Sequence, residues 1–217
     1  MINSGVDHLT NGATLDLARK YEFIHPTLGL SPNLLDGMSD AEIKMVLDQI
    51  EENAGEIIGV GEAGLDHYRC TDLAGRKRQV EIFQLVIDLA RSLDLPLVIH
   101  SRKAEQDAFE MVRNLDRVVF HCYGGTLATM REIVDNGFYI SLATNLCRSA
   151  HHKVLAKQIP LDSLLIETDS PYLSPRSGRN EPAYVLDSVE LIAKIKGISP
   201  RDVAETTARN TRDVYSF

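Results

Sequence analysis

The sequence predicts an α/β fold, and within that class a (β/α) barrel of the TIM type. Short β-like apolar runs recur along the chain, helical patterns separate them, and the runs are evenly spaced. Strands that alternate with helices form parallel sheets. Even spacing favours a barrel, although a doubly wound sheet would produce it too. The centres of the last four runs are 21, 21 and 25 residues apart, at Val98, Val119, Ile140 and Leu165.

Each predicted element rests on its hydrophobic pattern. β-branched and aromatic residues mark the strands, and the clearest helix follows Gly75, with apolar residues at three- and four-residue spacings. The predicted strands are 22–30, 56–62, 95–100, 117–122, 138–143 and 164–169, and residues 1–7 contain the tail of a possible further strand. The predicted helices are 40–53, 80–93, 103–114, 127–136, 150–158, 184–196 and 200–210. The glycines of "GVGEAG" match a dinucleotide-binding fingerprint only weakly.

Composition narrows the class of protein. A chain of 217 residues with 44% hydrophobic content suits one globular domain over residues 1–217. No apolar run approaches the ~18 residues of a membrane span, and the first residues lack a signal-peptide pattern. The three cysteines include no C-x-x-C pair, which argues against a disulfide framework or a structural zinc site. We therefore expect a cytoplasmic protein.

The charge balance limits the kind of nucleic-acid binding. The net charge of −8 argues against a broad basic surface for duplex nucleic acid. A substrate held locally by metal ions and a few arginines remains compatible with it.

Polar side chains stand at the ends of four predicted strands. In barrels, functional groups gather at the carboxyl ends of strands. Two imidazoles with carboxylates form a donor set for a divalent metal ion. Each residue alone has an ordinary alternative, as a hydrogen-bonded core histidine or a turn cap, but the coincidence at four strand ends favours a metal site. These residues are Glu62, His100, His121 and Asp169.

The stretch "LLIETDSPYL" ends a predicted strand in two acids. Glu167 and Asp169 are two residues apart, so strand alternation predicts that both point to the same face. Two carboxylates in a poorly solvated place need a metal, a cation or hydrogen-bond donors to neutralise them. The alternative is that Asp169 only caps the following turn.

Five segments together resemble a known family. "GEAGLDHY", "LPLVIHSR", "VVFHCYGG", "LLIETDSPYLSP" and "RNEPAYV" are similar, in this order, to motifs of the TatD family of metal-dependent deoxyribonucleases, which belong to the amidohydrolase-like TIM barrels. The resemblance covers nearly the whole chain. It implies hydrolysis of DNA, at ends or in single strands, with one or two divalent ions (Mg²⁺, Mn²⁺ or Zn²⁺). It also implies that Glu62 bridges the ions, that His100 and His121 hold one, and that Asp169 helps to hold the other.

Further roles follow from the same resemblance and from position. Asp169 is expected to act as a ligand and a proton acceptor, while Glu167 lies deeper and orients its neighbours. Phosphate contact or a surface salt bridge are the alternatives for the two arginines, and base stacking or packing for the tyrosines. These candidate substrate-binding residues are Arg102, Arg179, Tyr68, Tyr123 and Tyr172.

The chain departs from the family pattern at its beginning. It has no His-x-His pair, and Ser31 stands where the family's Gly-Leu-His-Pro has histidine. The length is about 30 residues short of the ~250 typical of such barrels, so we expect the first βα unit to be missing. A start at an internal methionine, a natural seven-strand form and a degenerate relative all remain open. An exposed barrel edge would favour association with another chain, such as a second copy.

The departures lower the expected activity and keep other functions open. We expect weak or no nuclease activity from these 217 residues. One alternative is hydrolysis of another bond, such as an amide or a lactone, because fold does not fix the substrate. The other is a non-catalytic protein that keeps one metal on Glu62, His100 and His121.

Overall fold

The computed structural model describes all 217 residues and divides into two compact units, Met1–Val119 and Phe120–Phe217. Strands and helices alternate along both units, which confirms the α/β prediction. None of the helices is both long enough and apolar enough to cross a membrane. The assignment of residues 1–217 to one domain stays a prediction.

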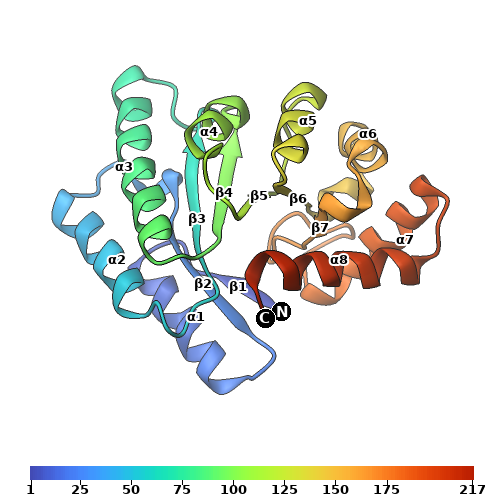
Figure 1. Ribbon diagram of the computed structural model, residues 1–217, viewed down its shortest axis with the longest axis horizontal. Helices are drawn as coiled ribbons and strands as arrows, with labels where there is room; N and C mark the ends of the chain where they lie inside the picture. The colour runs from blue at the N-terminus through green and yellow to red at the C-terminus, as the bar shows by residue number, and fades with distance from the viewer. The chain divides into compact units, whose positions relative to one another are not determined.

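The first unit contains a parallel sheet covered by helices on its outer side (Figure 1). Its paired strands follow chain order: β1 (Ile2–Ser4), β2 (His25–Leu30), β3 (Gly59–Asp66) and β4 (Leu97–Arg102). Its helices are α1 (His8–Lys20), α2 (Asp40–Glu52), α3 (Leu73–Ser92) and α4 (Glu105–Val112).

Burial and capping explain these elements. Val60 and Leu65 of β3, like Ile99 of β4, are 0% exposed, as expected for strands covered on both faces. Helix α3 buries one stripe of apolar side chains at three- and four-residue spacing. Helix α2 begins with a capping box, in which Ser39 and Glu42 satisfy each other's backbone N–H groups.

Two glycines allow the backbones of neighbouring strands to approach each other closely at the centre of this sheet. A Cβ on Gly29 would lie 2.3 Å from the Glu62 nitrogen, and one on Gly64 would lie 2.1 Å from the His100 oxygen. The register of β3 shifts between Val60 and Ala63 against both neighbouring strands. Bulges of this kind re-aim side chains near functional sites, and the residues inside this one are Gly61 and Glu62.

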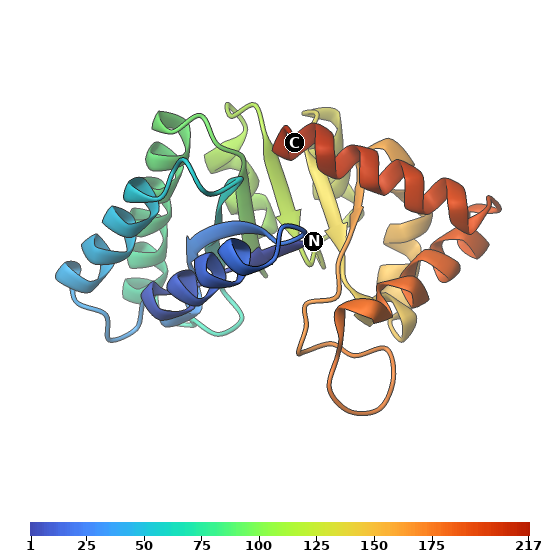
Figure 2. The same ribbon diagram turned by 90° about the horizontal axis from the view of Figure 1, so that it is seen from below.

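The second unit has shorter strands and a long connection. The strands are β5 (Val118–His121), which contains the unit boundary, β6 (Tyr139–Leu142) and β7 (Leu164–Ile166), with β6 and β7 parallel. The helices are α5 (Leu127–Asp135), α6 (Ala150–Gln158), α7 (Val185–Lys196) and α8 (Pro200–Tyr215), and α7 packs against α8. Figure 2 shows the long segment between β7 and α7, in orange, as a loop that extends from this unit.

The sequence located most elements and missed two features. All six predicted strands and all seven predicted helices are present, with ends shifted by up to seven residues, the most at the start of α3. Helix α1 was not predicted, because its apolar residues form no regular stripe. Strand β7 ends at Ile166, so the prediction of a strand through Asp169 was wrong at its carboxyl end.

Candidate metal centre

In the first unit, His100 lies between two carboxylates. Its Nε2 is 2.9 Å from Asp66 Oδ2, and its Nδ1 is 3.1 Å from Glu62 Oε1. The three side chains are 17%, 1% and 16% exposed, respectively. These residues form the unit 1 cluster: Glu62, Asp66 and His100.

The number of protons available to these side chains favours a cation between His100 and Glu62. An ionised carboxylate only accepts hydrogen bonds, and a neutral imidazole carries one N–H. With Nε2–H donated to Asp66, the Nδ1 of His100 faces Glu62 favourably only if a second proton or a metal ion lies there. Two ligand atoms at typical bond lengths on one tetrahedral metal are about 3.4 Å apart, close to the observed 3.1 Å.

Asp66 was missed by the sequence analysis, although it orients His100. Its Oδ1 accepts the backbone N–H groups of Tyr68 at 3.0 Å and Arg69 at 2.8 Å. Burial acts to raise the pKa of Asp66, but the hydrogen bonds from His100 and these N–H groups outweigh it, so the pKa is lowered. An aspartate at the end of a buried strand, directly before a turn, is the signal that could have found it.

In the second unit, His121 also has a carboxylate on each side. Its Nδ1 is 2.9 Å from Glu167 Oε2, and its Nε2 is 3.9 Å from Asp169 Oδ1. Ser141 donates to the same Glu167 oxygen at 2.7 Å, while Glu167 Oε1 is buried without a hydrogen-bond partner. Glu167 therefore fixes the tautomer of His121 and leaves Nε2 as the lone-pair nitrogen. The residues of this unit 2 cluster are His121, Glu167 and Asp169.

The prediction that strand alternation aligns the two acids was wrong. Glu167 and Asp169 lie beyond the end of β7, and Asp169 has a left-handed backbone with φ of 58°. Both carboxylates nevertheless reach His121, because this turn, rather than the pleat of a strand, directs the Asp169 side chain.

Donor atoms in this unit can hold a metal ion. The ligand atoms of His121, Cys122 and Asp169 lie within 4.8 Å of one another. Cys122 follows β5 with φ of 46°, so its side chain departs from the alternation of the strand. Nitrogen, oxygen and sulfur donors together fit a borderline divalent ion such as Zn²⁺. Cys122 was not among the predicted site residues, and the metal-ligand roles of the others stay a prediction.

The predicted substrate-binding residues fall into different environments. The Arg102 guanidinium stacks on the Tyr68 ring, 3.8 Å from its centroid, and Tyr68 is 57% exposed. Arg179 and Tyr172 are exposed on the loop after β7. Tyr123 is 0% exposed and donates its hydroxyl to the Thr126 carbonyl, which fits the packing alternative rather than base stacking.

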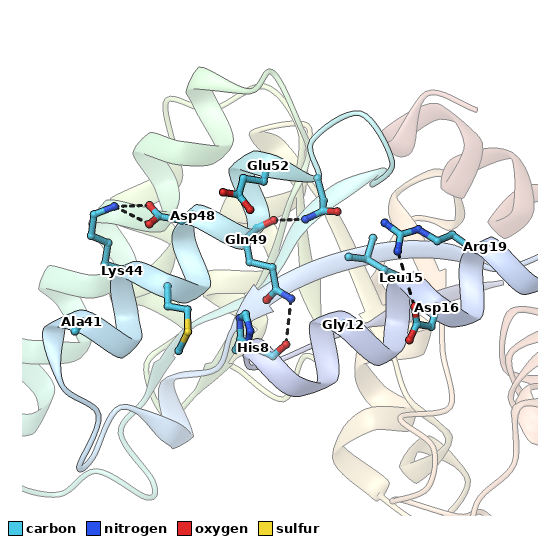
Figure 3. A pocket seen from close by; sticks show the side chains of 12 residues that line it. His8, Gly12, Leu15, Asp16, Arg19, Ala41, Lys44, Asp48, Gln49 and Glu52 are labelled. Carbon is cyan, nitrogen blue, oxygen red and sulfur yellow. Dashed lines mark hydrogen bonds and ion pairs between the residues drawn. The ribbon is translucent and has the colours of Figure 1, made fainter.

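A surface pocket elsewhere in the first unit lacks this chemistry. It has a volume of about 630 Å³, lies between α1 and α2, and includes no predicted site residue. Figure 3 shows two ion pairs among its charged groups, of Lys44 with Asp48 at 2.6 Å and of Arg19 with Asp16 at 3.8 Å. The histidine–carboxylate clusters are therefore the better candidates for catalysis.

Comparison with known proteins places the chain among metal-dependent hydrolases. It is 38% identical over 94% of its length to an uncharacterised metal-dependent hydrolase of Methanocaldococcus jannaschii, spanning 82% of that protein. It is 31% identical over 99% of its length to the 3'-5' ssDNA/RNA exonuclease TatD of Salmonella typhimurium, spanning 86% of that protein.

The family model described as TatD related DNase matches residues 1–216, so the chain belongs to this family. The crystal structure of a TatD homologue from Escherichia coli matches 100% of this chain and 86% of its own, with a TM-score of 0.90 at 24% identity. That likeness confirms the barrel-type fold class. The absence of a first βα unit stays a prediction.

Proposed function

We propose that the protein is a metal-dependent hydrolase that cleaves phosphodiester bonds of DNA, at ends or in single strands. Glu62, His100, His121 and Asp169 are its proposed ligands for one or two divalent ions. Family membership and the name of the Salmonella relative support the reaction class.

The observation that carries the proposal is the pairing within each cluster. In both units, one imidazole nitrogen contacts an orienting carboxylate and the other faces a second carboxylate. Metal-binding histidines in proteins show this arrangement, since the outer carboxylate fixes the tautomer and raises the basicity of the ligand nitrogen.

A bound divalent ion would supply Lewis acidity toward a phosphate oxygen and lower the pKa of a bound water. The chain's own residues do the remaining work. Asp66 and Glu167 hold the imidazoles of His100 and His121 in position. Asp169 Oδ1 is the proposed acceptor of the proton that the attacking water loses.

The stacked pair of Arg102 and Tyr68 is the proposed contact for substrate in the first unit. The guanidinium carries hydrogen-bond donors suited to a phosphate, and the exposed tyrosine offers a ring to a base. Arg179 offers a second exposed guanidinium on the loop of the other unit.

A nuclease assay tests the proposal. Chelator-treated protein is returned to Mg²⁺, Mn²⁺ or Zn²⁺ and given end-labelled single-stranded DNA, duplex DNA and RNA of the same sequence. We expect weak cleavage of single-stranded DNA, seen only after metal is restored, and loss of that cleavage in Glu62→Gln.

Glu52→Gln is the matched control, because Glu52 is an exposed carboxylate on α2. It should cleave like the wild type. Failure of the wild type to cleave any DNA with any of the three metals would refute the proposed reaction, as would full activity in Glu62→Gln.

A further inference from the structure

We propose that Asn180 is a positioning residue that sets the conformation of the Asp169 loop, and through it the metal affinity of Asp169. The inference rests on the proposed function, because it assigns to Asp169 a metal ion to hold. It is carried by a buried hydrogen-bond hub inside the second unit.

The hub joins Asn180 to the segment on both sides of Asp169. The Asn180 side-chain amide donates to the Thr168 carbonyl at 2.7 Å and to the Tyr172 carbonyl at 2.6 Å. The backbone N–H of Asn180 donates to the Pro171 carbonyl at 3.0 Å. Asn180 therefore contacts one residue that precedes Asp169 in the chain and two residues that follow it.

Thr144, from the turn after β6, completes the hub. Its hydroxyl accepts from the Asn180 amide at 2.9 Å and lies 3.1 Å from the Thr168 carbonyl and 2.9 Å from the Leu173 carbonyl. Asn180 is 2% exposed and Thr144 is 0% exposed. Hydrogen bonds that are buried away from water in this way are directional, and losing one costs free energy because a buried polar group is left without a partner.

Asp169 needs this support, because its backbone is not held by a sheet. Strand β7 ends three residues earlier, and both Asp169 and Leu173 have left-handed φ values, of 58° and 55°. Such conformations are unfavourable for residues other than glycine and persist only where the surroundings determine them. Releasing the hub should let Asp169 turn away from His121.

The donor count makes asparagine specific here. A side-chain amide has two N–H groups, whereas aspartate has none and a hydroxyl has one. Three acceptors share these two hydrogens, so aspartate at position 180 would place a carboxylate against carbonyl oxygens. The Asn180 carbonyl in turn accepts the Glu181 N–H at 3.0 Å.

A second buried asparagine of the same unit provides a matched control. Asn210 is also 2% exposed, and its amide donates to the carbonyls of Leu161 at 2.8 Å and Leu164 at 2.9 Å, before and at the start of β7. Asn210→Ala removes the same kind of bonds without touching the Asp169 loop.

The experiment is a calorimetric Mn²⁺ titration of the metal-free protein. We expect Asn180→Ala to weaken Mn²⁺ binding by roughly 10–100-fold, the range measured for groups that orient metal ligands. Asn210→Ala should lower the melting temperature about as much as Asn180→Ala does, but it should change Mn²⁺ affinity by less than about twofold. Added to Asp169→Asn, the Asn180→Ala change should have no further effect on affinity.

Thr144→Val and Thr144→Ser give the same test with a smaller change, in case Asn180→Ala does not fold. The valine variant should weaken Mn²⁺ binding and the serine variant should restore it. Equal affinities for wild type, Asn180→Ala and Thr144→Val would overturn the positioning role alone. Equal affinities for wild type and Asp169→Asn would instead overturn the proposed metal role of Asp169, and the role of Asn180 with it.

Discussion

The two histidine–carboxylate clusters use the same chemistry but are held in place by different means. In the unit 1 cluster, Asp66 and His100 lie inside the paired strands β3 and β4, where Gly64 is the register partner of His100. In the unit 2 cluster, Glu167 and Asp169 lie beyond a three-residue strand. Side-chain hydrogen bonds, rather than regular strand pairing, hold the loop that carries Asp169.

The difference concerns where rigidity comes from. A strand ladder fixes side-chain direction through regular backbone bonds. A loop fixes it through a few buried polar contacts, whose loss is local and severe. We therefore expect substitutions of the residues that orient the ligands to cost more stability in the unit 1 cluster than in the unit 2 cluster.

The largest expected effect is that of Asp169→Asn. Because Asp169 is the proposed ligand and proton acceptor, turnover of single-stranded DNA should fall by roughly 10²–10⁴-fold. The melting temperature should change little, since the side chain is 31% exposed. Turnover close to that of the wild type would show that the loop carboxylate takes no part in the chemistry.

A smaller effect separates the two orienting carboxylates. Asp66 is 1% exposed and has every oxygen partnered, so Asp66→Asn should lower the free energy of unfolding by about 3 kcal/mol, the lower end for a broken buried pair. Glu167 has one oxygen without a partner, so Glu167→Gln should cost about 1 kcal/mol. Urea unfolding followed by circular dichroism measures both. The opposite order would contradict the assignment of rigidity to the ladder.

The smallest effect concerns a histidine outside both clusters. Burial, reinforced by the neighbouring charge of His151, lowers the pKa of His152. The neutral form is therefore favoured in the fold, and stability should fall as pH drops below about 6.5, the pKa of an unfolded histidine. Partial exposure keeps the slope well below about 1.4 kcal/mol per pH unit.

His152→Gln should flatten this decline between roughly pH 6.5 and 5. Urea unfolding at a series of pH values makes the comparison. Identical pH dependence in wild type and His152→Gln would show that the histidine titrates as it does in the unfolded chain.

Sequence patterns predicted the fold well, because strand and helix periodicities are local. The runs around Val98 and Ile140 became β4 and β6 within a residue or two of the predicted ends. Helix α1 was not predicted because Leu15 is its only buried apolar side chain, so the usual stripe is absent. Its stability comes from packing against β2 and from the cap at Asp7.

The candidate site was harder to predict, because it depends on departures from regular structure. The sequence placed both histidines at strand ends, and His121 does end β5, whereas His100 lies two residues before the end of β4. The contact between Glu167 and His121 depends on the turn after Ile166, which alternation does not describe. Asn180 acts through backbone carbonyls of another segment, and no spacing along the chain signals such contacts.

Direct metal binding tests the central claim that both clusters supply metal ligands. The measurement is equilibrium binding of Zn²⁺ and Mn²⁺ to the metal-free wild type, His100→Ala, His121→Ala and the surface control His8→Ala. We predict that each of the first two substitutions weakens binding at least 10-fold and that His8→Ala binds like the wild type. Unchanged affinity in either His100→Ala or His121→Ala would contradict the account.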